Sequence, residues 1–168
     1  VIFCEGAAVK KNPWFDWLPV SPIKGQILTI EGAPPVAEAL RGGSLLKSCW
    51  LVPEQKVQGR FRLGATYERD FSHFDPDSQG TSELLRKLDG FYHSSHQYKV
   101  LDRVSGVRPC SGDHRPIVGR HPLYEQLYCF NGFGSKGSLW IPYWARRFVE
   151  TLGEGECVLP PEVDVRRF

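Results

Sequence analysis

The sequence predicts an α+β protein in which an antiparallel sheet with one helix is inserted between two parts of a separate α/β layer. From roughly residue 20 to 105, strand-like segments alternate with polar turns, while both ends carry short apolar strands and one amphipathic stretch. Hydrophobic residues make up 41% and charged residues 24% of the 168 residues, which is enough apolar material for a sizeable core. A chain that leaves one layer, builds a second and returns produces this order.

The middle of the chain contains four strand-like segments and one helix-like segment. Residues 25–31 are apolar at positions that favour a largely buried strand. Residues 48–53 and 58–66 predict a hairpin, because polar residues separate them and the second segment alternates in polarity. Residues 98–108 predict another strand. Between the hairpin and that strand, leucines fall on one helical face, which predicts a helix over about 82–92 with the preceding threonine as its N-cap.

The two ends of the chain predict the second layer. Residues 1–9 predict one buried strand that ends at a Gly-Ala turn, and residues 116–119 and 127–131 predict two more short strands. Apolar residues at helical spacing predict a final helix over 138–152, in which Pro142 lies close enough to the start to be tolerated.

Composition excludes several classes of protein. The formal net charge is +2 and the basic residues are scattered, so a nucleic-acid partner is not expected. No apolar run is long enough for a transmembrane segment, and no signal segment opens the chain. Five widely spaced cysteines without a CxxC pair fit a reduced, cytoplasmic compartment. The chain begins directly on the strand-like Val1–Cys4 without a methionine, so we expect it to be a fragment.

Some candidate residues carry weaker signals. Two groups of metal-ligating residue types occur, namely His93 with His96, and Cys110 with Asp113 and His114. Neither group reaches four ligands at a recognisable spacing, so no metal is expected. Tyr67 begins the polar stretch Tyr67–Asp70 after a predicted strand, and it could donate to a substrate, although such charged loops usually face water.

The most informative motif is a glycine run, Asn131–Gly137, close to the C-terminus. The strand-like segment before it and the predicted helix after it give the context of a nucleotide-binding turn, in which the backbone approaches a ligand at a helix N-terminus. A phosphate-binding P-loop is excluded, because Lys136 precedes Gly137 instead of serine or threonine. The alternative is a glycine-rich helix entry that binds no ligand.

Three segments, in this order and spacing, resemble the C-terminal half of the FAD-dependent amino acid oxidases of the D-amino acid oxidase and glycine oxidase superfamily. They are Ser21–Gln26 (SPIKGQ), Ser105–Gly119 with its Gly-Val-Arg-Pro and Asp-x-x-Pro-x-x-Gly motifs, and the glycine run. The resemblance extends over essentially the whole chain. The dinucleotide fingerprint, which lies in the N-terminal half of such proteins, is absent from this sequence.

The resemblance implies a division of the chain into domains. Residues 1–19 would be a strand and linker of the FAD-binding domain, residues 20–105 the substrate-binding domain, and residues 106–168 the C-terminal part of the FAD-binding domain. The implied fold is therefore α+β, with an antiparallel substrate-domain sheet and helix beside part of an FAD-binding α/β domain.

The resemblance also implies roles for individual residues. Arg108 would bind the substrate carboxylate, and the chemistry agrees because a guanidinium matches a carboxylate with two parallel hydrogen bonds. The alternative is a structural ion pair. Lys24 lies at the implied entry to the substrate domain near the flavin, and it is either a cofactor contact or an exposed lysine at a strand start. The backbone of Gly134–Gly137 would lie against the flavin pyrimidine edge, and Lys136 could add a positive charge there. The implied cofactor-binding residues of the run are Gly132, Phe133, Gly134, Ser135, Lys136 and Gly137.

The implied activity is oxidation of the C–N bond of an amino acid or related amine, by hydride transfer to flavin N5 of FAD. The small-molecule amine and the missing N-terminal FAD-binding half are the implied partners. Because that half is missing, we expect the chain alone to bind FAD weakly and to be inactive. The alternative function is a non-catalytic binding or scaffold module derived from the substrate domain.

Overall fold

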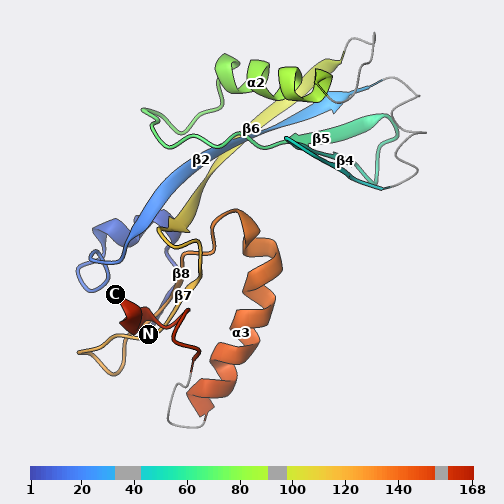
Figure 1. Ribbon diagram of the computed structural model, residues 1–168. Helices are drawn as coiled ribbons and strands as arrows, with labels where there is room; N and C mark the ends of the chain where they lie inside the picture. Colours follow the sequence, from blue (N-terminus) through green and yellow to red (C-terminus); the bar gives the residue numbers. More distant parts are fainter. Residues whose placement is uncertain (33–42, 91–97, 154–158) are drawn as a thin grey trace. The chain divides into compact units, whose positions relative to one another are not determined.

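In a computed structural model of the chain, the described residues are 1–32, 43–90, 98–153 and 159–168. The chain forms two compact units. Unit 1 consists of residues 1–23 and 107–168, and unit 2 consists of residues 24–106. Two long strands, β2 (Val20–Glu31) and β6 (Lys99–Ser111), pass from one unit into the other (Figure 1).

A five-stranded sheet forms the main layer of unit 2. Its order is β3-β4-β5-β2-β6, with β3 at Leu45–Leu46, β4 at Trp50–Pro53 and β5 at Arg60–Gly64. Strands β4 and β5 pair antiparallel, which confirms the predicted hairpin. Both β2 and β6 are longer than predicted. The predicted strands do not extend past Pro22 and Pro109, because proline cannot donate a hydrogen bond to a neighbouring strand. A strand tolerates proline beyond its hydrogen-bonded part or at the edge of a sheet.

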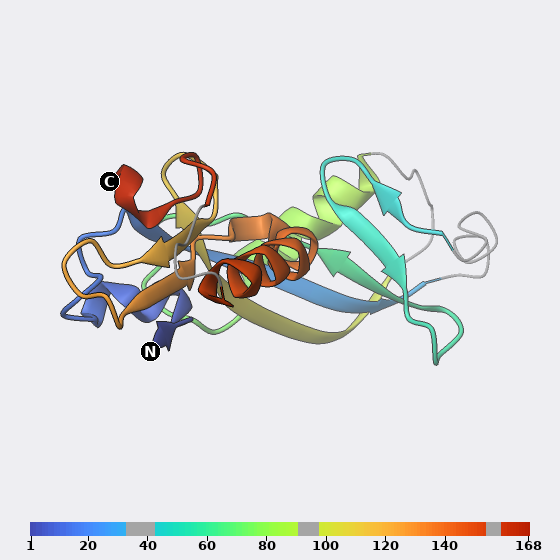
Figure 2. The ribbon, with the colours of Figure 1, turned by 90° about the horizontal axis from the view of Figure 1, so that it is seen from below.

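One face of this sheet is covered by α2 (Ser78–Asp89), as two perpendicular views show (Figures 1 and 2). The helix starts four residues before the predicted position. The predicted N-cap, Thr81, is wrong, because Asp77 is the N-cap and its side chain accepts a hydrogen bond from the Gly80 amide. The predicted helical face is confirmed, since Leu84 and Leu88 are buried against the sheet. The core of this unit comprises Leu28, Ile30, Cys49, Leu51, Phe61, Leu63, Leu84 and Leu88.

Unit 1 contains a three-stranded sheet in the order β1-β8-β7. Strand β1 (Ile2–Phe3) runs parallel to β8 (Tyr128–Asn131), which pairs antiparallel with β7 (Ile117–Arg120). The prediction of one strand over residues 1–9 is wrong. Gly6 adopts a φ of +61°, which turns the chain into a 3₁₀ helix, η1 (Gly6–Lys11), that buries Val9.

The C-terminal part of unit 1 packs on this sheet. A 3₁₀ turn, η2 (Gly134–Lys136), leads into α3 (Gly137–Gly153), which contains Pro142 in its second turn and packs through Trp144 and Phe148. The tail ends in η3 (Val165–Arg167). Within the described ranges, no helix is long and apolar enough to cross a membrane.

Candidate cofactor and substrate site

The carboxyl ends of the parallel strands β1 and β8 lie at the same edge of the sheet in unit 1. Gly6 follows β1 and Gly132 follows β8, so two tight turns meet there. The buried side chain of Asn131 joins them, because its amide nitrogen donates to the Gly6 carbonyl at 2.9 Å and its oxygen accepts from the Gly132 amide at 2.8 Å. Ligands of α/β sheets bind outside the carboxyl ends of strands, so this edge is the candidate cofactor site.

The first two glycines of the glycine run are required by its own backbone. Gly132 has a φ of +73° and Gly134 a φ of +56°, which favour glycine. A Cβ on Gly132 would lie 2.9 Å from Cγ1 of Ile117, and one on Gly134 would lie 3.3 Å from Sγ of Cys110. The run therefore packs directly against β7 and the end of β6. These two glycines shape the turn, while the residues after them face outward.

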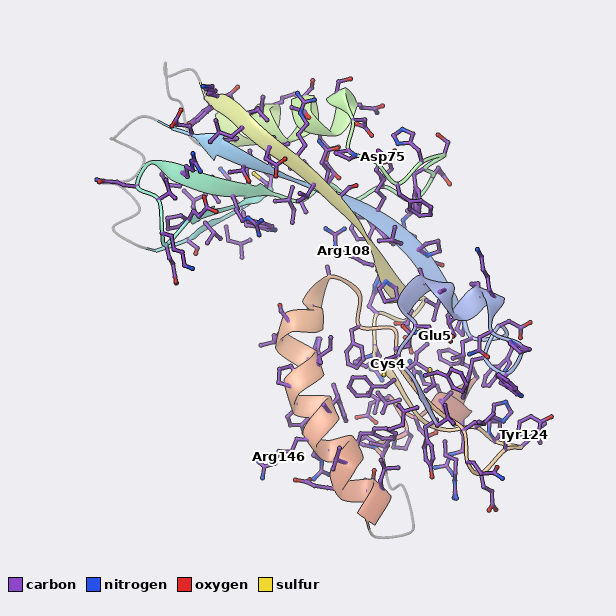
Figure 3. The ribbon with its side chains drawn as sticks, turned by 180° about the vertical axis from the view of Figure 1, so that it is seen from behind. Cys4, Glu5, Asp75, Arg108, Tyr124 and Arg146 are labelled. Carbon is purple, nitrogen blue, oxygen red and sulfur yellow. The ribbon has the colours of Figure 1, made fainter. Side chains whose placement is uncertain are left out.

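The Arg108 segment comes to the same edge. Cys110 forms an isolated antiparallel bridge with Phe133, and a Cβ on Gly6 would lie 3.8 Å from Cγ of Pro109. Arg108, which is labelled in Figure 3, lies near the end of β6 and is half-buried. Unit 1 thus brings together three segments that lie far apart in the sequence: the turn after β1, residues 107–109 of the Gly-Val-Arg-Pro motif, and the glycine run.

The outer part of the glycine run offers hydrogen-bond donors. Ser135 and Lys136 are exposed in η2, whose 3₁₀ turn runs directly into α3 at Gly137, so the helical stretch begins at Gly134. The first amide groups of a helix have no partner within it and carry a partial positive charge. This edge can therefore bind a group that carries carbonyl oxygens or negative charge.

In unit 2, Lys24 is buried rather than exposed, which excludes the alternative of a solvent-facing lysine at a strand start. Only 1% of it is exposed. Its Nζ atom lies 2.9 Å from Oδ2 of Asp77 and 3.4 Å from Oε2 of Glu68. The hydrogen bond to Asp77 raises the pKa of Lys24, and the attraction of both carboxylates adds to this effect. The ammonium group is therefore engaged by two carboxylates of this unit.

Tyr67 follows β5 and is 45% exposed, so its ring can meet a ligand. The guanidinium carbon of Arg69 lies 5.6 Å from the centre of that ring, in a cation–π contact. Tyr67 belongs to unit 2, whereas Arg108 and the glycine run belong to unit 1.

The sequence interpretation did not single out Asn131, Gln26 or Asp77 as site residues. An asparagine directly before a glycine turn is a usable signal for Asn131. An aspartate before Ser78 and a helical stripe is a usable signal for the N-cap role of Asp77. Gln26 gave no such signal, because its partners come from residues 66 to 81 and only the fold brings them close.

Metal-ligand clusters are not found in the part of the chain that the structure describes, where three or more His, Cys, Asp or Glu side chains never gather around one point. Cys110, Asp113 and His114 therefore do not form such a cluster, whereas His93 and His96 lie outside the described residues. Asp113 instead pairs with Arg167, whose Nε atom lies 2.9 Å from Oδ2.

The fold defines an α+β protein whose antiparallel sheet is inserted into an α/β layer, with the candidate cofactor site at the carboxyl ends of its parallel strands. The chain belongs to the FAD dependent oxidoreductase family, whose sequence model matches residues 1–151. This match confirms the resemblance that the ordered motifs indicated. FAD is the cofactor of the family.

Similar proteins agree with this assignment. The chain is 29% identical over 126 residues to a glycine oxidase of Bacillus licheniformis, covering 72% of this chain and 31% of that protein. A solved glycine oxidase of Geobacillus kaustophilus superposes with a TM-score of 0.77 at 23% identity, over 93% of this chain and 41% of that one. An iminodiacetate oxidase of Chelativorans sp. BNC1 gives a TM-score of 0.75 at 29% identity, over 96% and 44%. The chain spans about a third of the length of the curated relatives it matches.

The residues at the candidate edge fit a flavin. The ring of this cofactor presents carbonyl oxygens and ring nitrogens along one side, and the edge offers amide donors at the start of η2 together with the exposed Lys136. A side chain on Gly132 or Gly134 would point into β7 or β6. The absence of side chains at these two positions therefore serves packing rather than ligand access.

Proposed function

We propose that this chain is part of an FAD-dependent oxidoreductase that oxidises the C–N bond of an amino acid or related amine. The observation that carries the proposal is the meeting of the glycine run and the Arg108 segment at one edge of unit 1, through the Cys110–Phe133 bridge. When bound, the flavin accepts a hydride from the carbon next to the amine. The residues of this chain bind the substrate and the flavin and orient them relative to each other.

Arg108 binds the carboxylate of the substrate. A guanidinium stays charged when half-buried and forms two parallel hydrogen bonds with a carboxylate. Fixing the carboxylate at two points leaves the α-carbon few orientations, which lowers the entropic part of the barrier. Tyr67, exposed in unit 2, supplies a further substrate contact in this proposal.

The glycine run binds the pyrimidine edge of the flavin, through backbone amides at the start of η2 and through Lys136. These donors and the positive end of the helix favour negative charge on a group bound there. Lys24 is not needed as a cofactor contact in this proposal, because its ammonium is bound to Asp77 and Glu68.

Small amine substrates that bear a carboxylate are the best-supported class. The similar proteins include glycine oxidases and an iminodiacetate oxidase, whose named substrates share a carboxylate one carbon away from the nitrogen. An arginine in the position of Arg108 suits that common feature. This chemistry supports binding and oxidation of such amines over amines that lack a carboxylate.

A second polypeptide segment that carries the dinucleotide fingerprint completes the cofactor site in this proposal. Val1 is 72% exposed and Ile2 45% exposed, although parallel strand pairs are normally covered on both faces. Large apolar residues on α3 are also exposed, with Leu139 at 70% and Val149 at 64%.

A family member of this kind would work in the cytoplasm, in keeping with the four described cysteines, which are free.

The test compares Arg108→Ala with Arg103→Ala in the complete oxidase, using glycine, iminodiacetate and an amine without a carboxylate. Loss of a charged hydrogen-bond pair should lower kcat/KM for the carboxylate substrates by about 10- to 100-fold and leave the third substrate unchanged. Arg103 is exposed on β6, so its replacement should leave kcat/KM unchanged for all three substrates. Equal kinetics of the two variants would remove Arg108 from the site. A complete protein that binds no flavin would favour the binding-module function instead.

A further inference from the structure

Unit 2 holds a charged network between β2 and the start of α2, in which Lys24 is buried while the side chains of Glu68 and Asp77 are 39% and 27% exposed. Lys24 is among the largest fully buried side chains, and the buried Gln26 lies two residues further along the same strand. Replacing a buried ion pair by apolar residues is often neutral or stabilising, so such a pair is weak evidence for stability alone. A role in fixing the position of neighbouring segments is the better-attested use of buried polar groups.

Lys24 connects two segments that are remote in the sequence. Its backbone pairs with Glu68 in both directions, with each amide donating to the carbonyl of the other residue at 3.0 Å. Its ammonium group contacts the Glu68 carboxylate and, more closely, the Asp77 carboxylate. Asp77 in turn accepts from the Gly80 amide at 2.7 Å and caps α2. One side chain therefore ties β2 to both the segment after β5 and the start of α2.

Gln26 repeats this connection one step along β2. The backbone amide of Gln26 donates to the hydroxyl of Thr66 at 2.8 Å, and the backbone amide of Thr66 donates to the backbone carbonyl of Gln26 at 3.2 Å. The side-chain oxygen of Gln26 accepts from the Asp77 amide at 2.9 Å, and the Gln26 Nε2 atom donates to Thr81 at 2.9 Å. Thr66 and Glu68, the residues on either side of Tyr67, are thus both fixed to β2.

Charge makes Lys24 the sensitive member of this network. Glu68 and Asp77 are two carboxylates that contact the same ammonium group. Without it they would repel each other, and each would keep only its remaining partners. Asp77 would still cap α2 through Gly80, whereas the Glu68 segment would lose its side-chain attachment. The segment after β5 is therefore expected to move first.

We propose that Lys24 is a positioning residue, whose ion pairs with Glu68 and Asp77 hold residues 66–68 in the backbone position that presents Tyr67 to the substrate. The substrate role of Tyr67 rests on the proposed function. The positioning itself rests on contacts within unit 2 and can be measured without flavin or substrate.

The first experiment measures amide hydrogen exchange in the 168-residue chain with Lys24→Met, which keeps most of the length of the side chain and removes its charge. The amides of Lys24 and Glu68, which bond each other across the strand pair, should exchange at least about tenfold faster, while core amides of β4 and β5 change less. Lys87→Met is the matched control. Lys87 forms a surface pair with Glu83 on α2 at 2.5 Å, so its loss should leave exchange at Glu68 unchanged.

Glu68→Gln keeps the proposal testable if Lys24→Met does not fold, because it leaves the closer Asp77 pair in place. It should also speed exchange at Lys24 and Glu68. The refuting result is that both variants lower global stability and that exchange at these two amides speeds up only as much as exchange in the rest of unit 2. The network would then stabilise the unit without positioning residues 66–68.

The second experiment measures KM and kcat of the complete oxidase with Glu68→Gln, together with its affinity for FAD. The positioning role predicts a raised KM, with FAD affinity and global stability close to the unmodified protein. An unchanged KM despite faster exchange would overturn the link to substrate. A protein that oxidises no amine would instead refute the proposed function, and the exchange result would still decide the positioning role.

Discussion

Gly132→Ala tests the close packing of the glycine run at its most constrained position. The left-handed φ of +73° costs an L-residue about 1–2 kcal/mol. The new methyl group would lie 2.9 Å from Cγ1 and 3.3 Å from the backbone nitrogen of Ile117, and overpacking of this kind costs about 1–3 kcal/mol. The lower entropy of the unfolded alanine chain offsets about 0.4–1 kcal/mol. The expected loss of unfolding free energy is therefore about 2–4 kcal/mol.

Thermal and urea unfolding followed by tryptophan fluorescence would measure this loss, because four of the five tryptophans, all except Trp50, belong to unit 1. A chain of this size loses about 2–4 °C in Tm for each kcal/mol, so the expected fall is about 4–16 °C. The control is Gly137→Ala, in which φ is −54° and the nearest atom would be Cδ1 of Ile141 at 3.4 Å.

Gly137→Ala should be neutral or stabilising by up to about 1 kcal/mol, because alanine favours a helix over glycine. If Gly132→Ala were as stable as Gly137→Ala, the left-handed turn and its contact with β7 would both be wrong. The direct support for the shape of the candidate edge would then be lost.

Three further predictions concern charge and reactivity. Backbone and lysine hydrogen bonds lower the pKa of Asp77, so its stabilising effect is present above about pH 4 and is lost as the pH falls further. Urea midpoints should therefore drop more steeply from pH 4 to 2 in the natural protein than in Asp77→Asn. Among the four described cysteines, iodoacetamide should modify Cys4, which is exposed, well before Cys129, since burial raises the pKa of the Cys129 thiol to about 12. Arg167→Ala should lower stability by about 1 kcal/mol through loss of the pair with Asp113, and the difference should shrink in 1 M salt.

The sequence predicted those elements whose signals are local. The hairpin of β4 and β5 was readable because its residues alternate in polarity and its turn is polar. The helical face of α2 was readable from its leucines, and the last helix from its apolar spacing. The start of α2 was predicted wrongly at Thr81, although the aspartate before Ser78 is a usable local signal for the true N-cap, Asp77. The first strand was predicted too long, since an apolar run does not show where Gly6 turns the chain.

The sequence by itself determined the family and the motifs that define it, because these depend on residue types in a fixed order. It also identified Arg108 and the glycine run as the candidate residues. Only the tertiary structure decided that Asn131 joins the turns after β1 and β8, and that Lys24 is buried between two carboxylates. Partners of this kind lie 44 to 125 residues apart along the chain, so burial and pairing depend on the packed fold rather than on local pattern.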